Sequence, residues 1–287
     1  MIDAGAIPFV KTNISQGCRL VESQNNIWGT VNNPHNLSLS AGGSSGGEGA
    51  LVAMRGSPLG IGTDGGGSIR IPAAWNGVYG FKPSAQRFPK QGVRSPGISD
   101  SNSGSAIGPF ATDLHALELW CQTMLAAQPW LRDPECLPIP WREITIPKKL
   151  KIGLLVNDGV IHPSPPVQRV LSEVATELQL AGHEVIVLDW AALHYEGSCI
   201  IMKMYTEDGG MAMEEALNAS GEPVVPRVCT GSSERLLSPK EIWENKRAGK
   251  EFWRKYALQW RQAGVDVLIT AASPHAAPPH GQYVYVY

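Results

Sequence analysis

The second half of the chain carries the clearest periodic pattern of apolar residues. An apolar run over residues 151–156 predicts a buried strand, and apolar positions spaced three and four apart over 167–178 predict an amphipathic helix. Gly182 follows as a helix terminator, and a second apolar run over 184–188 predicts another strand. Strand, helix and strand in this order predict a βαβ unit with parallel strands.

Five further elements follow from the same reasoning. Residues 240–263 combine charged positions with an aromatic face and predict a long helix, and residues 265–270 predict a buried strand. Earlier in the chain, residues 6–10 predict a short buried strand, and residues 47–54 and 114–125 predict helices. The predicted fold class is therefore α/β with a mixed sheet.

A proline-rich stretch separates two parts of the predicted domain. Five prolines lie between residues 126 and 148, which predicts an irregular connection over the surface. We expect residues 1–125 to form a core with two serine loops, residues 126–150 to form the connection, and residues 151–287 to form a second α/β part of the same domain.

Composition excludes several classes of protein. Of the 287 residues, 43% are hydrophobic and 17% charged, which indicates a packed core and excludes disorder. The net charge of −2 and the pI near 6.4 give no sign of the basic surface that binds nucleic acid. No apolar run approaches the roughly 18 residues of a membrane-spanning helix, so none is expected.

The cysteines indicate a reducing compartment. Their number is odd, their spacing is wide and no Cys-x-x-Cys pair occurs, which argues against a disulfide framework and a zinc cluster. They are Cys18, Cys121, Cys136, Cys199 and Cys229. The N-terminus lacks the pattern of a signal peptide. We therefore expect a cytoplasmic protein without a metal.

Two loops of serine and glycine carry the candidate chemistry, residues 41–47 and 62–72. Glycine lets the backbone approach a ligand closely, so that consecutive N–H groups can point at one atom. Such a row can form an oxyanion hole, worth about 3–4 kcal/mol of activation barrier. The predicted donors are Gly65, Gly66, Gly67 and Ser68, with the Ser68 hydroxyl as nucleophile.

Residue types alone leave other uses of these loops open. Residues 42–46 fit the Gly-x-Ser-x-Gly elbow, which would make Ser44 a nucleophile with a histidine as base. The loops could also bind an anion or form plain turns. The lysine of a phosphate-binding P-loop is absent from both. Residues 60–65 match Gly-x-Gly-x-x-Gly, but glycine and then Pro72 follow where a dinucleotide-binding helix would begin.

The motifs taken together resemble the amidase signature family, and most of all its acetamidase and fatty acid amide hydrolase branch. Residues 42–51 read Gly-Gly-Ser-Ser-Gly-Gly-Glu-Gly-Ala-Leu, and the stretches 57–72 and 77–84 match the rest of the signature. The flanking segments 5–13 and 108–113 agree as well. The resemblance implies a large twisted mixed sheet with helices on both faces, incomplete in this chain.

The resemblance also implies a chemistry. A small carboxamide would be hydrolysed to an acid and ammonia or an amine through an acyl-enzyme, without a cofactor. Ser68 would be the nucleophile, and Ser44, held by a non-proline cis peptide, would pass its proton to a lysine. Supporting residues would be Ser45, Thr63, Asp64 and Arg70, and Cys18 would lie near the acyl pocket.

The family's lysine precedes the segment that here begins at Gly5, so we expect no counterpart for it and truncation at both ends. Lys11 and Lys82 fall on other motif positions and are weaker candidates for the base. The alternatives are an inactive relative that acts by binding, or an esterase or acyl transferase. The sequence leaves the substrate and the oligomeric state open.

Overall fold

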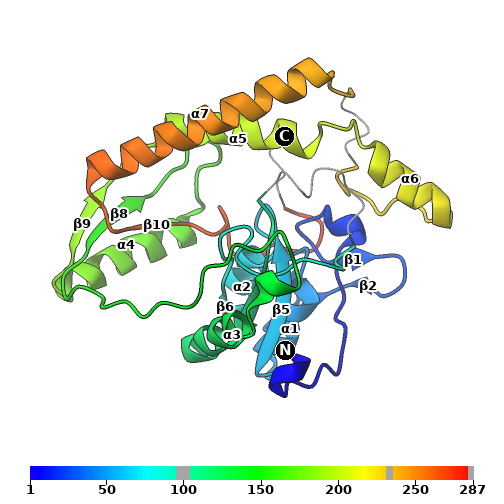
Figure 1. Ribbon diagram of the computed structural model, residues 1–287, viewed down its shortest axis with the longest axis horizontal. Coiled ribbons are helices and arrows are strands. Elements are labelled where there is room, and N and C mark those ends of the chain that lie inside the picture. The colour runs from blue at the N-terminus through cyan, green and yellow to red at the C-terminus, as the bar shows by residue number, and fades with distance from the viewer. Residues whose placement is uncertain (95–103, 231–234, 284–287) are drawn as a thin grey trace. The chain divides into compact units, whose positions relative to one another are not determined.

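The computed structural model divides into two units, each of which combines helices with strands (Figure 1). It describes residues 1–94, 104–230 and 235–283. Unit 1 comprises Met1–Glu143, Gly210–Ser233 and Ala277–Tyr283. Unit 2 comprises Ile144–Gly209 and Glu234–Ala276. The predicted α/β class is confirmed.

Unit 2 is built on a parallel sheet of three strands. The strands are β8 (Lys151–Leu155), β9 (Glu184–Val187) and β10 (Val267–Thr270), in the order β10-β8-β9. Ile152 of the central strand pairs with Val185 on one side and Val267 on the other. The predicted βαβ pairing is confirmed, and the strand predicted over 265–270 is the third member of the sheet.

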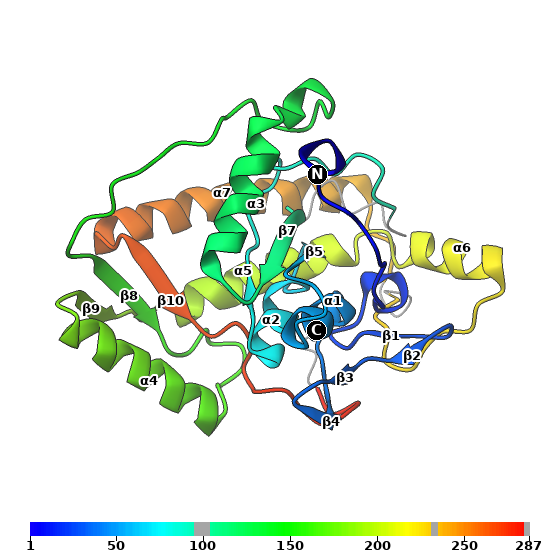
Figure 2. The same cartoon turned by 90° about the horizontal axis from the view of Figure 1, so that it is seen from below.

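Helices cover both faces of this sheet (Figure 2). They are α4 (Pro165–Leu180) on one face and α5 (Ala191–Tyr205) and α7 (Pro239–Ala263) on the other. The aromatic face of α7 packs through Phe252, Tyr256 and Trp260 against a buried cluster around Leu155 and Trp190. The helix predicted over 240–263 is confirmed, and the spacing of four places these three aromatic residues on one helical face.

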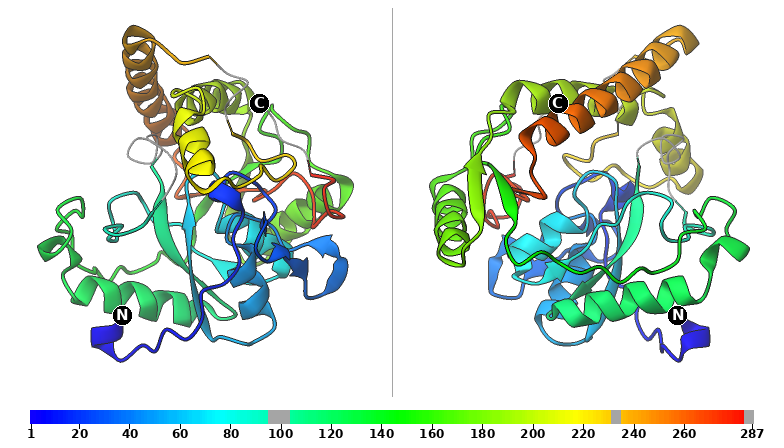
Figure 3. Two further views of the ribbon diagram at one scale, coloured as in Figure 1. Left: turned by 90° about the vertical axis from the view of Figure 1, so that its right-hand side faces the viewer. Right: turned by 60° about the vertical axis from the view of Figure 1, so that its left-hand side comes forward.

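Unit 1 contains an antiparallel sheet that positions the serine loops. Its strands are β5 (Leu59–Asp64), β6 (Tyr79–Gly80) and β7 (Ala106–Ala111), in the order β5-β7-β6. Phe110 of β7 points toward α1 (Gly46–Ala53) and α2 (Arg70–Asn76), where it packs against Val52 and Ile69. Ile107 packs on the opposite face against a cluster that includes Trp120 of α3 (Leu114–Ala126), because successive strand residues alternate in direction. Figure 3 shows the three helices on the two sides of these strands.

The remaining elements of unit 1 are short. The helices are η1 (Ile2–Ala4), η2 (Gln16–Cys18), η4 (Pro129–Leu131) and α6 (Met211–Ser220). The strands are β1 (Gln24–Asn25), β2 (Gly29–Thr30), β3 (Asn32–Asn33) and β4 (Asn36–Ser40), paired β1-β2 and β3-β4. Among the described residues, no helix is both long and apolar enough to cross a membrane.

The strand predicted over residues 6–10 is wrong. The segment has no regular structure, and Ile7 and Phe9 are 84% and 63% exposed. Pro8 cannot donate a backbone hydrogen bond to a neighbouring strand. An apolar run alone is therefore not enough to predict a strand, since a strand also needs a neighbouring strand to pair with.

Phe110 tests the packing of α1 and α2 onto the sheet. Phe110→Ala should lower the free energy of unfolding by about 3–5 kcal/mol, because the side chain is fully buried and its loss leaves a cavity. Phe9→Ala is the matched control and should change stability little, since Phe9 is exposed. Urea unfolding measures both, and equal effects would contradict the packing described here.

Candidate active site

The two serine loops lie together because each connects a strand to a helix on the same side of unit 1. The first loop (residues 41–47) runs from β4 into α1, and the second (residues 62–72) includes the end of β5 and the start of α2. The amide of Ser45 donates to the carbonyl oxygen of Ser68 at 3.3 Å. The backbone of one loop thus holds the backbone of the other.

A glycine in β5 permits this close approach. A Cβ atom at Gly62 would lie 2.8 Å from Ser45 Oγ and 2.7 Å from the Phe110 ring, too close for any side chain. Gly62 shares a strand face with Asp64, which is two residues further on. The Ser45 hydroxyl lies 3.4 Å from both the amide nitrogen and the carbonyl oxygen of Thr63. Ser45 and Thr63 therefore form part of the contact between the loops.

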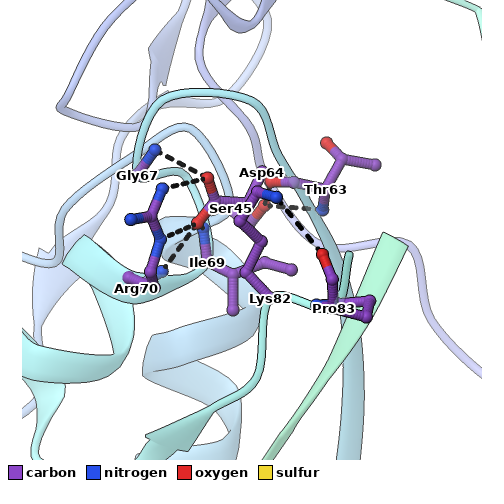
Figure 4. Close-up of polar contacts among 8 residues, drawn as sticks. All are labelled: Ser45, Thr63, Asp64, Gly67, Ile69, Arg70, Lys82 and Pro83. Carbon is purple, nitrogen blue, oxygen red and sulfur yellow. Dashed lines mark hydrogen bonds and ion pairs between the residues drawn. The ribbon is translucent and has the colours of Figure 1, made fainter. Parts of the chain in front are cut away.

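Asp64 determines the path of the second loop (Figure 4). Its fully buried carboxylate accepts the amide of Gly67 at 2.7 Å, that of Ile69 at 3.1 Å and that of Arg70 at 3.2 Å. The Arg70 guanidinium adds Nε and Nη2 contacts, each of 2.9 Å. Five donors thus close the loop around one carboxylate.

These donors also decide the charge state of Asp64. Burial by itself raises the pKa of the carboxyl, but the hydrogen bond and charge of Arg70 and the amides of Ile69 and Gly67 outweigh it. The net effect is a pKa below the ordinary value of 3.8. Asp64 is therefore a carboxylate at neutral pH and remains an acceptor for the loop.

Asp64 accepts only some of the amides of the second loop. In the described part of the chain, the N–H groups of Gly65, Gly66 and Ser68 donate to no other residue. Gly66 is exposed, and Gly65 and Ser68 are partly buried. Gly67 differs from the other three predicted donors, because its amide is already bonded to Asp64. The second loop thus contains three N–H groups without a partner among the described residues, one of which belongs to Ser68 itself.

Ser44 is buried within the first loop. The Gly43–Ser44 peptide bond is cis, as the family resemblance implied. The Ser44 carbonyl accepts the amide of Ser15 at 3.2 Å and the hydroxyl of Ser23 at 2.9 Å. No hydrogen bond joins the hydroxyls of Ser44 and Ser68 within the described residues. The two serines are connected through backbone contacts of their loops.

Ser23 is a supporting residue that sequence reasoning missed. Its fully buried hydroxyl donates to the Ser44 carbonyl and accepts the amide of Gly46 at 2.7 Å. Its own amide donates to the carbonyl of Gly42 at 3.0 Å. Ser23 thus contacts the first loop at three points. Nothing in the polar stretch around it distinguishes this serine from an exposed one.

Lys11 and Lys82 are the two candidate bases in the sequence. Lys11 is exposed. Burial lowers the pKa of Lys82, Asp64 raises it and Arg70 lowers it, with a net lowering from 10.5. The Lys82 amine donates to the carbonyl of Pro83 at 3.2 Å (Figure 4). Lys82 is therefore close enough to Asp64 and Arg70 for their charges to shift its pKa.

Cys18 lies at the end of η2, close to the first loop. Its amide donates to the carbonyl of Ser15 at 3.0 Å, and Ser15 in turn binds Ser44. The buried Gln16 side chain fixes the same turn to a distant segment. It donates to Glu222 Oε1 at 2.8 Å and to the Pro223 carbonyl at 3.0 Å, and accepts the amide of Val225 at 2.8 Å. Residues 222–225 therefore contact the turn that contains Cys18.

Asp64→Asn tests the carboxylate. At pH 7 it should lower the free energy of unfolding by about 2–3 kcal/mol, less than the loss of a fully buried ion pair, because Arg70 is half exposed. A lowered folded-state pKa gives stability that is complete above the unfolded value of 3.8 and disappears as the pH falls through the folded value. Urea unfolding against pH should show the two proteins converging in acid. Asp3→Asn, at an exposed ion pair, is the control; a constant difference at all pH values would count against this assignment.

Known proteins match almost the whole chain. A family model described as amidase covers residues 1–286. An acetamidase of Aspergillus oryzae is 36% identical, with 98% of this chain and 54% of that protein aligned. Amidase 1 of Gibberella moniliformis is 37% identical, with 96% of this chain and 55% of that protein aligned.

Solved structures agree with this match. A fatty acid amide hydrolase superposes with a TM-score of 0.88 at 32% identity, covering 94% of this chain and 48% of that one. The predicted fold is confirmed, and the chain spans about half the length of the curated relatives it matches. The family match, the identities and the shared fold lead to one conclusion: the chain belongs to the amidase signature family.

Proposed function

We propose that this protein hydrolyses a small, linear carboxamide to a carboxylic acid and ammonia or an amine, with Ser68 as the nucleophile. The observation that carries the proposal is the set of unpaired amides at Gly65, Gly66 and Ser68. Fixed N–H donors beside a hydroxyl suit the negative oxygen that forms when a carbonyl is attacked. The relatives named as acetamidase and amidase support the same reaction class.

The proposed chemistry has two stages. Ser68 Oγ attacks the amide carbon and loses its proton through the Ser44 hydroxyl to a lysine base, and the proton then passes to the leaving amine. Water hydrolyses the acyl-enzyme by the reverse route. Gly67 keeps the loop closed through Asp64, so the oxyanion donors are the other three amides. Neither Lys11, which is exposed, nor Lys82, whose amine donates to the carbonyl of Pro83, is proposed as this base.

One observation favours a second candidate, a protein that binds amides without hydrolysing them. The described residues contain no hydrogen bond between the hydroxyls of Ser44 and Ser68, whereas a proton relay requires one during the reaction. The oxyanion donors would still bind a carbonyl oxygen in such a protein. Labelling of the nucleophile distinguishes the two candidates.

The cysteines support a cytoplasmic location as part of the same proposal. All five are free thiols. Burial raises the pKa of the Cys121 thiol to about 11, which makes it a poor nucleophile at neutral pH. Cys199 is exposed and Cys18 and Cys229 are partly buried, and exposed thiols suit a reducing compartment.

A fluorophosphonate probe should label the hydrolase covalently at Ser68. Ser68→Ala should abolish labelling, because the probe reacts with an activated hydroxyl held beside oxyanion donors. Ser84→Ala, at an exposed serine, should leave labelling unchanged. Peptide mass spectrometry identifies the modified residue. Folded protein that stays unlabelled would favour the binding protein over the hydrolase.

Ser44→Ala tests the proton relay. It should slow amide hydrolysis on the order of 10²–10⁴-fold, the usual loss when an acid–base group is removed, and leave a slow residual rate. Steady-state hydrolysis of a simple carboxamide measures the effect, with Ser38→Ala as an exposed control. Undiminished turnover in Ser44→Ala would remove this serine from the mechanism.

A further inference from the structure

We propose that residues 278–281 hold the first serine loop in its place, and that His280 is the positioning residue of this contact. The segment belongs to unit 1 and lies more than 230 residues after the loop in the chain. It forms hydrogen bonds with two stretches that lead to the Gly43–Ser44 peptide. One is the turn at Glu22 and the other is the end of β4. Its effect on reaction rate rests on the proposed function, whereas its effect on the loop does not.

The first connection is a buried carboxylate. Glu22 Oε1 lies 2.7 Å from His280 Nδ1, and Glu22 Oε2 accepts the amide of Gly281 at 3.1 Å. His280 Nε2 lies 3.1 Å from the carbonyl oxygen of Leu37. Both ring nitrogens thus lie within hydrogen-bond distance of an oxygen, Nδ1 of the Glu22 carboxyl group and Nε2 of the Leu37 carbonyl group. The Glu22 side chain is almost fully buried, so His280 and Gly281 are the partners that make its burial tolerable.

The backbone around Glu22 connects the contact between Glu22 and His280 to the first loop. A Cβ atom on Gly43 would lie 2.9 Å from the backbone nitrogen and carbonyl carbon of Glu22, and 2.7 Å from the carbonyl oxygen of Leu20. The two backbones are therefore in direct contact at the Gly43–Ser44 peptide. The next residue, Ser23, bonds to Gly42, Ser44 and Gly46. A displacement of Glu22 must move Ser23 and with it the Ser44 carbonyl.

The second connection reaches the start of the loop. Ser40, the last residue of β4, donates its amide to the Pro278 carbonyl at 2.8 Å. Leu39 forms an isolated antiparallel bridge with Pro279. The Ser40 hydroxyl accepts the amide of Gly42 at 3.1 Å. The same short segment therefore holds β4, which leads into the loop, and the Glu22–Ser23 turn, which lies beside it.

Hydrogen exchange on the 287-residue chain tests the contact without any assay of activity. His280→Gln should speed exchange of the Ser23, Gly42 and Gly46 amides about tenfold or more, since the loss of a hydrogen bond to a charged group favours local opening. Amides of β5 and β7 should keep their rates. His115→Gln, at an exposed position on α3, is the matched control and should change none of them.

Glu22→Gln provides an independent variant of the same size, in case His280→Gln does not fold. It should speed exchange at the same three amides, because the amide side chain has one acceptor oxygen in place of two. Unchanged exchange at these amides in a folded variant of either kind would overturn the proposal.

The rate of amide hydrolysis gives the second measurement. A displaced Ser44 should lower kcat about tenfold in His280→Gln and leave KM nearly unchanged, because substrate binding does not depend on the proton relay. Faster exchange with an unchanged kcat would show that the segment has no positioning role in the reaction. Wild-type protein that neither hydrolyses amides nor is labelled at Ser68 contradicts the proposed function instead, and the exchange rates still decide whether residues 278–281 hold the loop.

Discussion

The arrangement of the second serine loop depends on one buried carboxylate. Asp64 is the last residue of β5, and it accepts amides from Gly67, Ile69 and Arg70. A carboxylate without these donors could not remain charged in a fully buried position. The same interaction that stabilises the loop therefore decides which N–H groups are free. It turns Gly67 inward and leaves its neighbours Gly65, Gly66 and Ser68 without partners inside the described chain.

The first loop can pack closely against its neighbours because two glycines at the contacts have no side chain. Gly62 admits the Ser45 hydroxyl against β5, and Gly43 admits the backbone of residues 20–22. Close packing of backbones brings Ser44 and Ser68 into one region without a direct bond between their hydroxyls. Ser23 then fixes the loop through polar contacts at Gly42, Ser44 and Gly46. The first loop is thus held by tight packing of its backbone, and the second by one buried charge.

Side chains alternate in direction along the strands of unit 1, which explains why the buried charge and the tight packing act on the same face of the sheet. On β5, Gly62 and Asp64 face the serine loops, while Leu59 packs with the residues of α3 on the opposite face. On β7, Phe110 closes the core under α1 and α2, and Ile107 faces α3. A sheet covered on both faces supplies a rigid base for the loops, which suits a site that must hold donors in fixed positions.

Local pattern determined much of this protein. Helical spacing gave α3, α4 and α7, apolar runs gave the parallel strands of unit 2, and the glycine and serine motifs gave the family. These features are encoded by residues close together in the chain. The tertiary structure alone decided the roles of Gln16, Glu22, Ser23 and His280, because their partners lie up to 259 residues away and polar residues in turns carry no periodic signal. It also decided that residues 6–10 form no strand, since pairing depends on a neighbour that the segment's own sequence does not specify.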